Sequence, residues 1–64
     1  MNKSEYREYF AECKKLIKLS YVCKVCGIPQ SHLAGFMGGY DYALSIAKLE
    51  TIRNTLISLC EKIA

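Results

Sequence analysis

The chain has 64 residues and a formal net charge of +3, and 52% of its residues are hydrophobic. A chain of this length has room for one domain with one small core, and its apolar content excludes a disordered segment. The mild positive charge permits nucleic-acid binding without requiring it. We therefore expect residues 1–64 to form a single domain, and a domain this small often gains stability by dimerising.

The first predicted helix begins at Ser4, whose hydroxyl is a good N-cap, and runs to about Ile17 or Lys18. Glutamates near its start and lysines near its end suit the helix dipole. Its apolar residues recur at intervals of three and four, which indicates one face packed on the core. That face consists of Tyr6, Tyr9, Phe10, Cys13, Leu16 and Ile17.

The stretch over about 19–38 predicts two short helices joined by a tight turn. The second helix runs from about Leu19 or Ser20 to Cys26, and the third spans about Pro29 to Met37. Gly27 supplies the left-handed conformation that ends the second helix. Pro29 is well placed at a helix start, where its missing N–H costs nothing. Two short helices around a glycine turn are typical of a helix-turn-helix.

The last predicted helix spans about 46–62, after an exposed loop at 40–42. Ser45 is its N-cap, and Leu44 with Leu49 matches the hydrophobic staple that brackets such a cap. One apolar stripe of this helix must close the core. Further apolar residues near its end either pack on the first helix or form a dimer interface; they are Ile57, Cys60 and Ile63.

The chain also carries a more specific set of residues, namely Gly27-Ile28, Gln30-Ser31, Leu33, Phe36 and Gly39, followed by Leu44-Ser45, Leu49 and Ile52. This set, within about 17–56, resembles the DNA-binding domain of the Cro/C1-type (XRE) family of phage and bacterial repressors. The resemblance implies an all-α, compact four- to five-helix lambda-repressor-like domain. It also implies a sequence-specific transcriptional regulator, a repressor acting as a homodimer on palindromic double-stranded DNA.

In such a regulator the third helix reads bases, and its neighbours contact phosphates. Gln can bind adenine bidentately, Ser can bond several base edges, and small residues allow close approach. The candidate base-reading residues are Gln30, Ser31, His32, Ala34 and Gly35. Gly35 inside a helix costs about 1 kcal/mol relative to Ala, which suggests that DNA or a partner approaches closely there. The candidate phosphate contacts, for which plain solvent exposure is the alternative, are Lys14, Lys15, Lys18, Ser20, Tyr21, Lys24 and Tyr40.

A protein-interaction module on the same fold is the alternative function. No Lys or Arg occurs between Lys24 and Lys48, so the third helix itself is uncharged. Such a helix could dock on a protein, for example a repressor or a defence enzyme, in place of DNA. We do not expect an enzyme, because one His and one Asp offer few groups for a converging catalytic site.

The four cysteines include a CxxC pair, Cys23 and Cys26. A zinc site needs four ligands, and the other candidates stand singly at unrelated spacings. We therefore interpret all four as reduced structural thiols and expect no metal, no cofactor and no small-molecule ligand. The longest uncharged run, 25–40, is too polar to span a membrane. No secretory leader is recognisable, so we expect a cytoplasmic protein.

Overall fold

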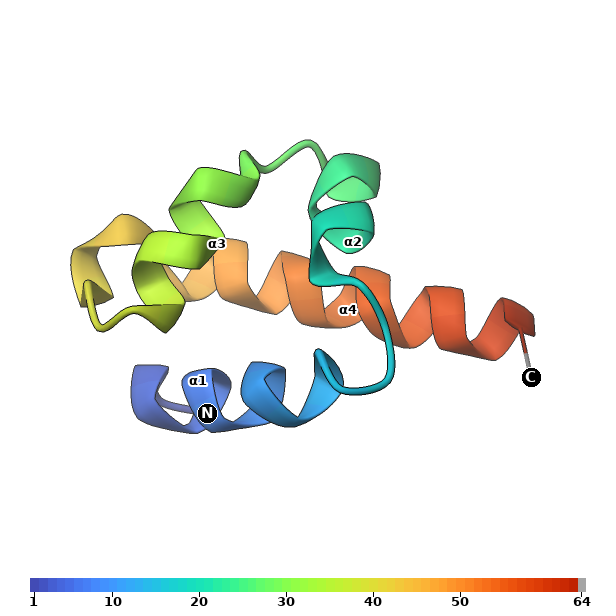
Figure 1. Cartoon of the computed structure of the whole chain (residues 1–64), viewed down its shortest axis with the longest axis horizontal. Helices are drawn as coiled ribbons and strands as arrows, with labels where there is room; N and C mark the ends of the chain where they lie inside the picture. Colours follow the sequence, from blue (N-terminus) through green and yellow to red (C-terminus); the bar gives the residue numbers. More distant parts are fainter. Residues whose placement is uncertain (64) are drawn as a thin grey trace.

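A computed structural model describes residues 1–63 of the chain. Helices account for all the regular structure in this range, which confirms the predicted all-α class. The longest helix, α4, runs the length of the molecule; α1 lies along one side of it, and α2 and α3 stand on the other (Figure 1). The elements are α1 (Lys3–Cys13), α2 (Leu19–Cys26), α3 (Gln30–Met37), the 3-10 helix η1 (Asp41–Ala43) and α4 (Ile46–Ile63).

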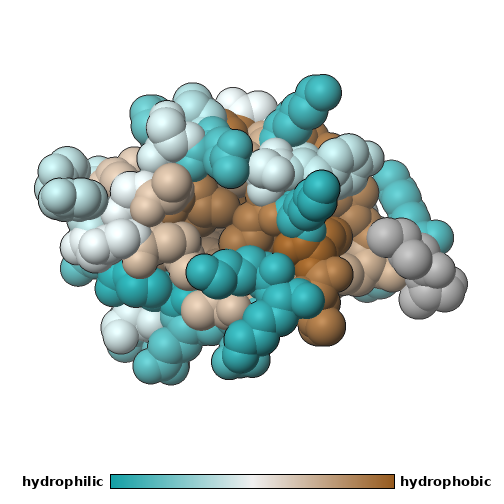
Figure 2. Space-filling view, viewed as in Figure 1, coloured by the Kyte–Doolittle hydropathy of each residue, from teal (hydrophilic) through white to brown (hydrophobic). Residues whose placement is uncertain are grey.

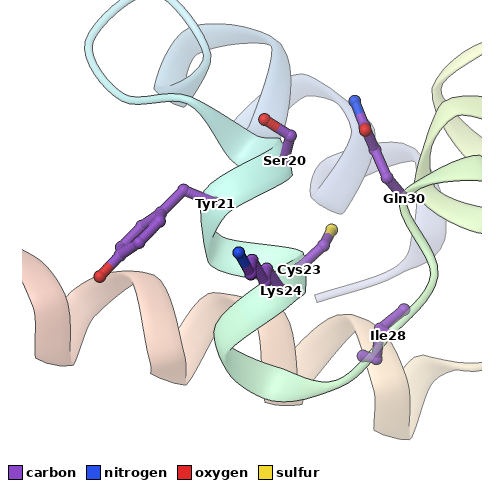
Figure 3. Close-up of a pocket in the computed structure, with 6 residues that line it drawn as sticks. All are labelled: Ser20, Tyr21, Cys23, Lys24, Ile28 and Gln30. Atoms are coloured by element: carbon purple, nitrogen blue, oxygen red, sulfur yellow. The ribbon is translucent and has the colours of Figure 1, made fainter.

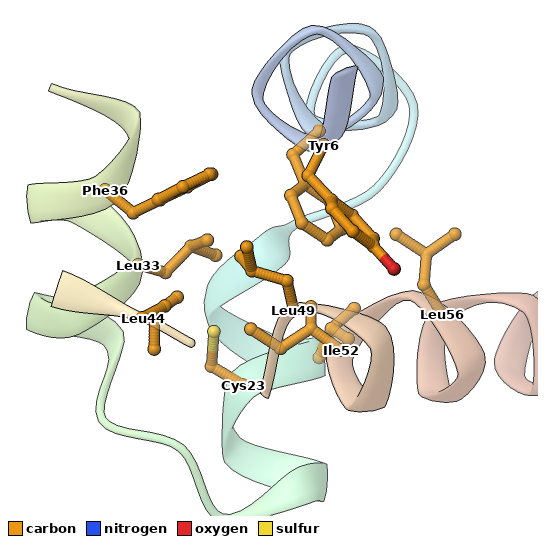
Figure 4. Close-up of a cluster of buried hydrophobic side chains, with 10 residues drawn as sticks. Tyr6, Cys23, Leu33, Phe36, Leu44, Leu49, Ile52 and Leu56 are labelled. Carbon is orange, nitrogen blue, oxygen red and sulfur yellow. The ribbon is translucent and has the colours of Figure 1, made fainter. Parts of the chain in front are cut away.

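One hydrophobic core holds the helices together. Side chains from all four α-helices and from the residue before Ser45 point into it (Figure 4). Burying a large aliphatic or aromatic side chain stabilises a fold by about 1.5–3 kcal/mol, so a core this small depends on each of its members. The buried residues are Tyr6, Phe10, Val22, Cys23, Leu33, Phe36, Leu44, Leu49, Ile52 and Leu56.

The turn between α2 and α3 has the predicted geometry. Gly27 adopts a left-handed conformation with φ of 75°, and the backbone N–H of Ile28 donates to the Cys23 carbonyl over 3.0 Å. Pro29 occupies the N-cap position of α3, one residue before the first helical residue. The predicted ends of both helices agree with the structure to within a residue. Local chemistry therefore sets this part of the fold.

The first helix differs from its prediction at both ends. Its N-cap is Asn2 and not Ser4: the Asn2 side chain accepts from the Glu5 N–H, and the Glu5 carboxylate accepts from the Asn2 N–H, each over 2.8 Å. The helix ends at Cys13, so none of the predicted C-terminal lysines lies in its last turn. The Leu16 side chain is 92% exposed and does not belong to the buried face.

The chain turns tightly after α3. Gly39, with φ of 111°, provides the left-handed residue, and the Tyr40 N–H donates to the Gly35 carbonyl over 3.0 Å. The stretch expected as an exposed loop at 40–42 is exposed, but most of it belongs to the short 3-10 helix η1. A charged cluster joins η1 to α1: Arg7 forms an ion pair with Asp41, and the Lys3 Nζ donates to the Asp41 carbonyl over 2.6 Å.

The start of α4 is as predicted. The Ser45 Oγ accepts from the Lys48 N–H over 3.3 Å, and the side chains of Leu44 and Leu49 on either side of the cap are buried. The capped start fixes where α4 begins against α3 and η1. Within the described residues, no helix has the combination of length and apolar character that crossing a bilayer requires.

Candidate nucleic-acid interface

Helix α3 presents polar and small residues to solvent along one face. Leu33 and Phe36 take the inward positions and are buried, which turns the intervening positions outward. The predicted base-reading residues Gln30, Ser31, His32 and Ala34 are all exposed, whereas Gly35 is only partly so.

Gly35 faces η1. A Cβ placed on Gly35 would lie 3.6 Å from the Cβ of Ala43, which is an ordinary van der Waals contact. The fold itself therefore leaves room for a methyl group at this position. Within residues 1–63 the neighbour at this position is Ala43, and the expected close approach of DNA or a partner stays a prediction.

Two adjoining grooves lie beside the exposed face of α3. The first, which we call the elbow groove, has a volume of about 460 Å³ and lies where α2 turns into α3. Figure 3 shows Ser20 and Gln30 rising on its two sides, while Tyr21 extends away from it. Its lining residues are Ser20, Tyr21, Cys23, Lys24, Ile28 and Gln30.

The second groove, the lysine groove, has a volume of about 340 Å³ and lies between the α1–α2 loop and α3. Its floor is apolar and its rim is polar. Seen as in Figure 1, hydrophobic side chains gather between α1 and the α2–α3 pair, with hydrophilic side chains around them (Figure 2). Leu19, Leu33, Ala34 and Met37 supply its apolar lining, and Lys14, Lys18, Ser20 and Gln30 its polar lining.

Ser20 and Gln30 line both grooves and so form the wall between them. The two grooves bring together many of the residues that the sequence assigned to DNA contact, although they come from the loop, α2 and α3. Of the apolar residues in the lysine groove, the sequence assigned Leu33 to the core and Ala34 to base reading. It did not indicate that Leu19 and Met37, which are partly buried, join them in one apolar floor.

Three exposed lysines line these grooves, Lys14 and Lys18 the lysine groove and Lys24 the elbow groove, and Lys15 lies between the first two in the sequence. Lys15 pairs with Glu12 over 3.3 Å, an exposed contact that is worth little in water. Lys14, Lys18 and Lys24 make no ion pair or side-chain hydrogen bond to any other part of residues 1–63. Their positive charges are therefore available to an external anion.

Two tyrosines lie on the η1 side of α3. The Tyr40 and Tyr42 rings pack edge to face with centroids 5.7 Å apart, and their residues are 57% and 83% exposed. Their hydroxyls can donate to phosphate oxygens, a common contact in protein–DNA complexes. The nearby Asp41 charge is compensated by Arg7.

The predicted dimer residues lie near the C-terminal end of α4. Ile57 is half-buried and Cys60 is exposed; Ile63 lies outside the residues whose side chains the structure describes. Arg53, one turn before Ile57, places its guanidinium 5.6 Å from the centre of the Tyr9 ring, so α1 covers this edge of α4. The outer face of α4 is polar.

All four cysteines are free thiols. Burial is the main cause that raises the pKa of Cys23, with the neighbouring Cys26 adding to it, and burial likewise raises the pKa of Cys13. Both thiols are therefore held in the protonated form at neutral pH. Within residues 1–63, no three His, Cys, Asp or Glu side chains gather in the way that a metal ion requires.

Comparison of the chain with protein-family models, with curated proteins and with solved structures finds no match in any of the three. The class of the molecule is thus defined by its own geometry. It is a small all-α domain of helix-turn-helix type, in which α1 and α4 support the α2–turn–α3 unit.

Proposed function

We propose that the protein is a sequence-specific DNA-binding regulator that places α3 in the major groove, as its resemblance to Cro/C1-type repressors implies. The observation that supports this most is the convergence of the expected contact residues. Lysines from the loop and α2, together with Ser20, Gln30 and Ala34, line two adjoining grooves beside the exposed face of α3.

The dimensions of α3 suit this role. An α-helix with its side chains is about 10–12 Å across, and the major groove is about 12 Å wide, so α3 can lie within the groove. With Leu33 and Phe36 held in the core, Gln30 and Ser31 are free to reach base edges. The helix carries no charge, so base reading here depends on amide and hydroxyl hydrogen bonds and on the small Ala34.

The charges for phosphate binding come from beside α3. Lys14 and Lys18 lie in and at the end of the α1–α2 loop, and Lys24 lies on α2. Each lysine that neutralises a phosphate releases condensed counterions, which gives affinity that falls with salt. Backbone N–H groups at the start of α2, next to Ser20, provide a further phosphate contact.

A homodimer on a palindromic operator completes the proposal. Half-sites one helical turn apart lie about 34 Å from each other. One copy of the chain measures 32 Å along its longest axis, so two adjacent copies can place their α3 helices in successive major grooves. Ile57 and Cys60 on α4 are the proposed contacts between the copies.

Selection of bound duplexes from a random-sequence pool tests the proposal. We expect a preferred palindromic sequence that binds at least about a thousandfold more tightly than random DNA. Affinity should fall steeply between low and moderate salt. A flat salt dependence, or equal affinity for selected and random duplexes, would argue against DNA binding as the function.

Two single variants sharpen the test. Lys24→Ala should weaken binding to every sequence alike and reduce the slope of log affinity against log salt by about one. Lys62→Ala removes the same charge at the far end of α4 and should leave the slope unchanged. Equal effects of the two variants would remove Lys24 from the interface.

A further inference from the structure

The lysine groove has a charged rim, which suits DNA, and an apolar floor, which does not. Leu19 at the start of α2 and Leu33 and Met37 on α3 give it an apolar floor. Phosphates and base edges are polar, and thymine offers only a methyl group as an apolar contact in the major groove. A duplex lying along α3 therefore leaves most of this floor without a matching partner.

A second apolar residue lies close by in the sequence. Leu16 stands in the α1–α2 loop, between the two rim lysines, and 92% of its surface is exposed. No other large hydrophobic residue among those described is so exposed. Leu16 therefore adds exposed apolar surface that lies close in the sequence to the two rim lysines, where an apolar partner could cover it.

The charge around the groove is of one sign. Lys14 and Lys18 lie on the rim, make no ion pair within residues 1–63, and no acidic side chain lines the groove. An occupant that complements this surface is apolar in its centre and acidic at its edges. A basic or uncharged partner would leave the lysines uncompensated.

We propose that the lysine groove binds a helical segment of a partner protein, with an apolar face flanked by acidic side chains. A floor built from two helices is the usual setting for such helix-in-groove recognition. A volume of about 340 Å³ lies near the lower end of ligand pockets and suits a few anchor side chains of one helix. The proposal stands whether or not the chain binds DNA.

A designed peptide serves as the probe. It is an end-blocked peptide of about 15 residues built from Glu, Ala and Leu, long enough to form a helix on binding. Its leucines are spaced three and four apart, so that they share one face, with glutamates on both sides. Two matched peptides carry Lys in place of every Glu, or Ala in place of every Leu.

Titration of the ¹⁵N-labelled chain, followed by NMR, gives the readout. We expect the acidic peptide to bind in the micromolar range and to shift the amide signals of Lys18, Leu33, Ala34 and Met37. The Lys-substituted and Ala-substituted peptides should bind at least tenfold more weakly. No binding of the acidic peptide, or shifts confined to the outer face of α4, would overturn the proposal.

Charge reversal provides the decisive control. Lys18 is exposed, so the Lys18→Glu variant should still fold. It should bind the acidic peptide at least tenfold more weakly and the Lys-substituted peptide more tightly. Lys62→Glu makes the same charge change at the far end of α4 and should alter neither. Leu16→Ser should also weaken the acidic peptide. Equal effects of Lys18→Glu and Lys62→Glu would show that net charge alone is responsible and that the groove is not the site.

Discussion

The guanidinium of Arg7 lies 4.6 Å from the centre of the Phe36 ring, and its Nε donates to the Phe36 carbonyl over 3.0 Å. One side chain of α1 therefore holds both the backbone and the side chain of the last turn of α3. The same guanidinium pairs with Asp41 of η1. The orientation of α3 is thus set at its C-terminal end by α1 as well as by the core.

Arg7→Met tests this contact. Methionine keeps much of the aliphatic bulk but loses the hydrogen bond, the cation–π contact and the ion pair, so the free energy of unfolding should fall by about 1–3 kcal/mol. Urea unfolding followed by circular dichroism measures the change. Lys15→Met breaks only the exposed pair with Glu12 and should cost less than about 0.5 kcal/mol. Similar losses in both variants would show that the Arg7 contacts carry no special weight.

Gly27 and Gly35 should respond to alanine in opposite directions. No atom lies within 4 Å of a Cβ placed on Gly27, but its φ of 75° disfavours L-residues, so Gly27→Ala should destabilise by about 1–2 kcal/mol. Gly35 has no such positive φ, and its added Cβ makes only an ordinary contact, so Gly35→Ala should stabilise by up to about 1 kcal/mol. Thermal melts of the two variants give the signs directly, and a loss of stability in both would contradict the geometry at Gly35.

Alkaline pH should destabilise the fold. Burial raises the pKa of Cys13, Cys23 and Tyr9 above their ordinary values, which are 9.0 for the thiols and 10.0 for the phenol. Between the ordinary pKa values and the raised values of the folded state, the unfolded chain releases protons that the folded chain retains, so unfolding is favoured as pH rises. The contribution of these three groups to stability should be constant well below pH 9.0 and fall above it. Melting temperatures on both sides of this value measure the effect, and Cys23→Ala should reduce the slope.

Gln30→Ala bears on base reading. If the Gln30 amide binds one base bidentately, the variant should lose about 1–3 kcal/mol on the preferred operator and discriminate less at one base pair. Affinities for the operator and for its single-base variants measure this. His32→Ala tests a second candidate base-reading residue on the same helix in the same way. An equal loss of affinity for all operator variants would show that Gln30 contacts the DNA backbone and not a base.

The α2–turn–α3 unit and the start of α4 could be predicted because their signals are local. Gly27, Pro29 and Ser45 act on residues within one helical turn of themselves. The start of α1 was also within reach: Asn2 stands three residues before Glu5, the spacing of a capping box, whereas Ser4 has Arg7 at that position. The end of α1 was not, because apolar spacing continues through Leu16 although the backbone leaves the helix after Cys13.

The contacts that orient α3 could not be predicted from pattern. Arg7 contacts Phe36 and Asp41, which lie 29 and 34 positions further along the chain, and no periodicity in the sequence connects such distant sites. The two grooves are likewise a product of how the loop, α2 and α3 meet. Their polar residues were identified one by one from side-chain chemistry. The apolar floor of the lysine groove depends on partial burial, which only the packed structure defines.

Ser20 and Gln30 form a wall that the two grooves share, since each residue lines both the elbow groove and the lysine groove. Two ligands that each need this wall exclude one another, and the concentration of one then sets the apparent affinity of the other. A chain with so little surface can in this way respond to a second molecule without changing shape, through competition for two side chains.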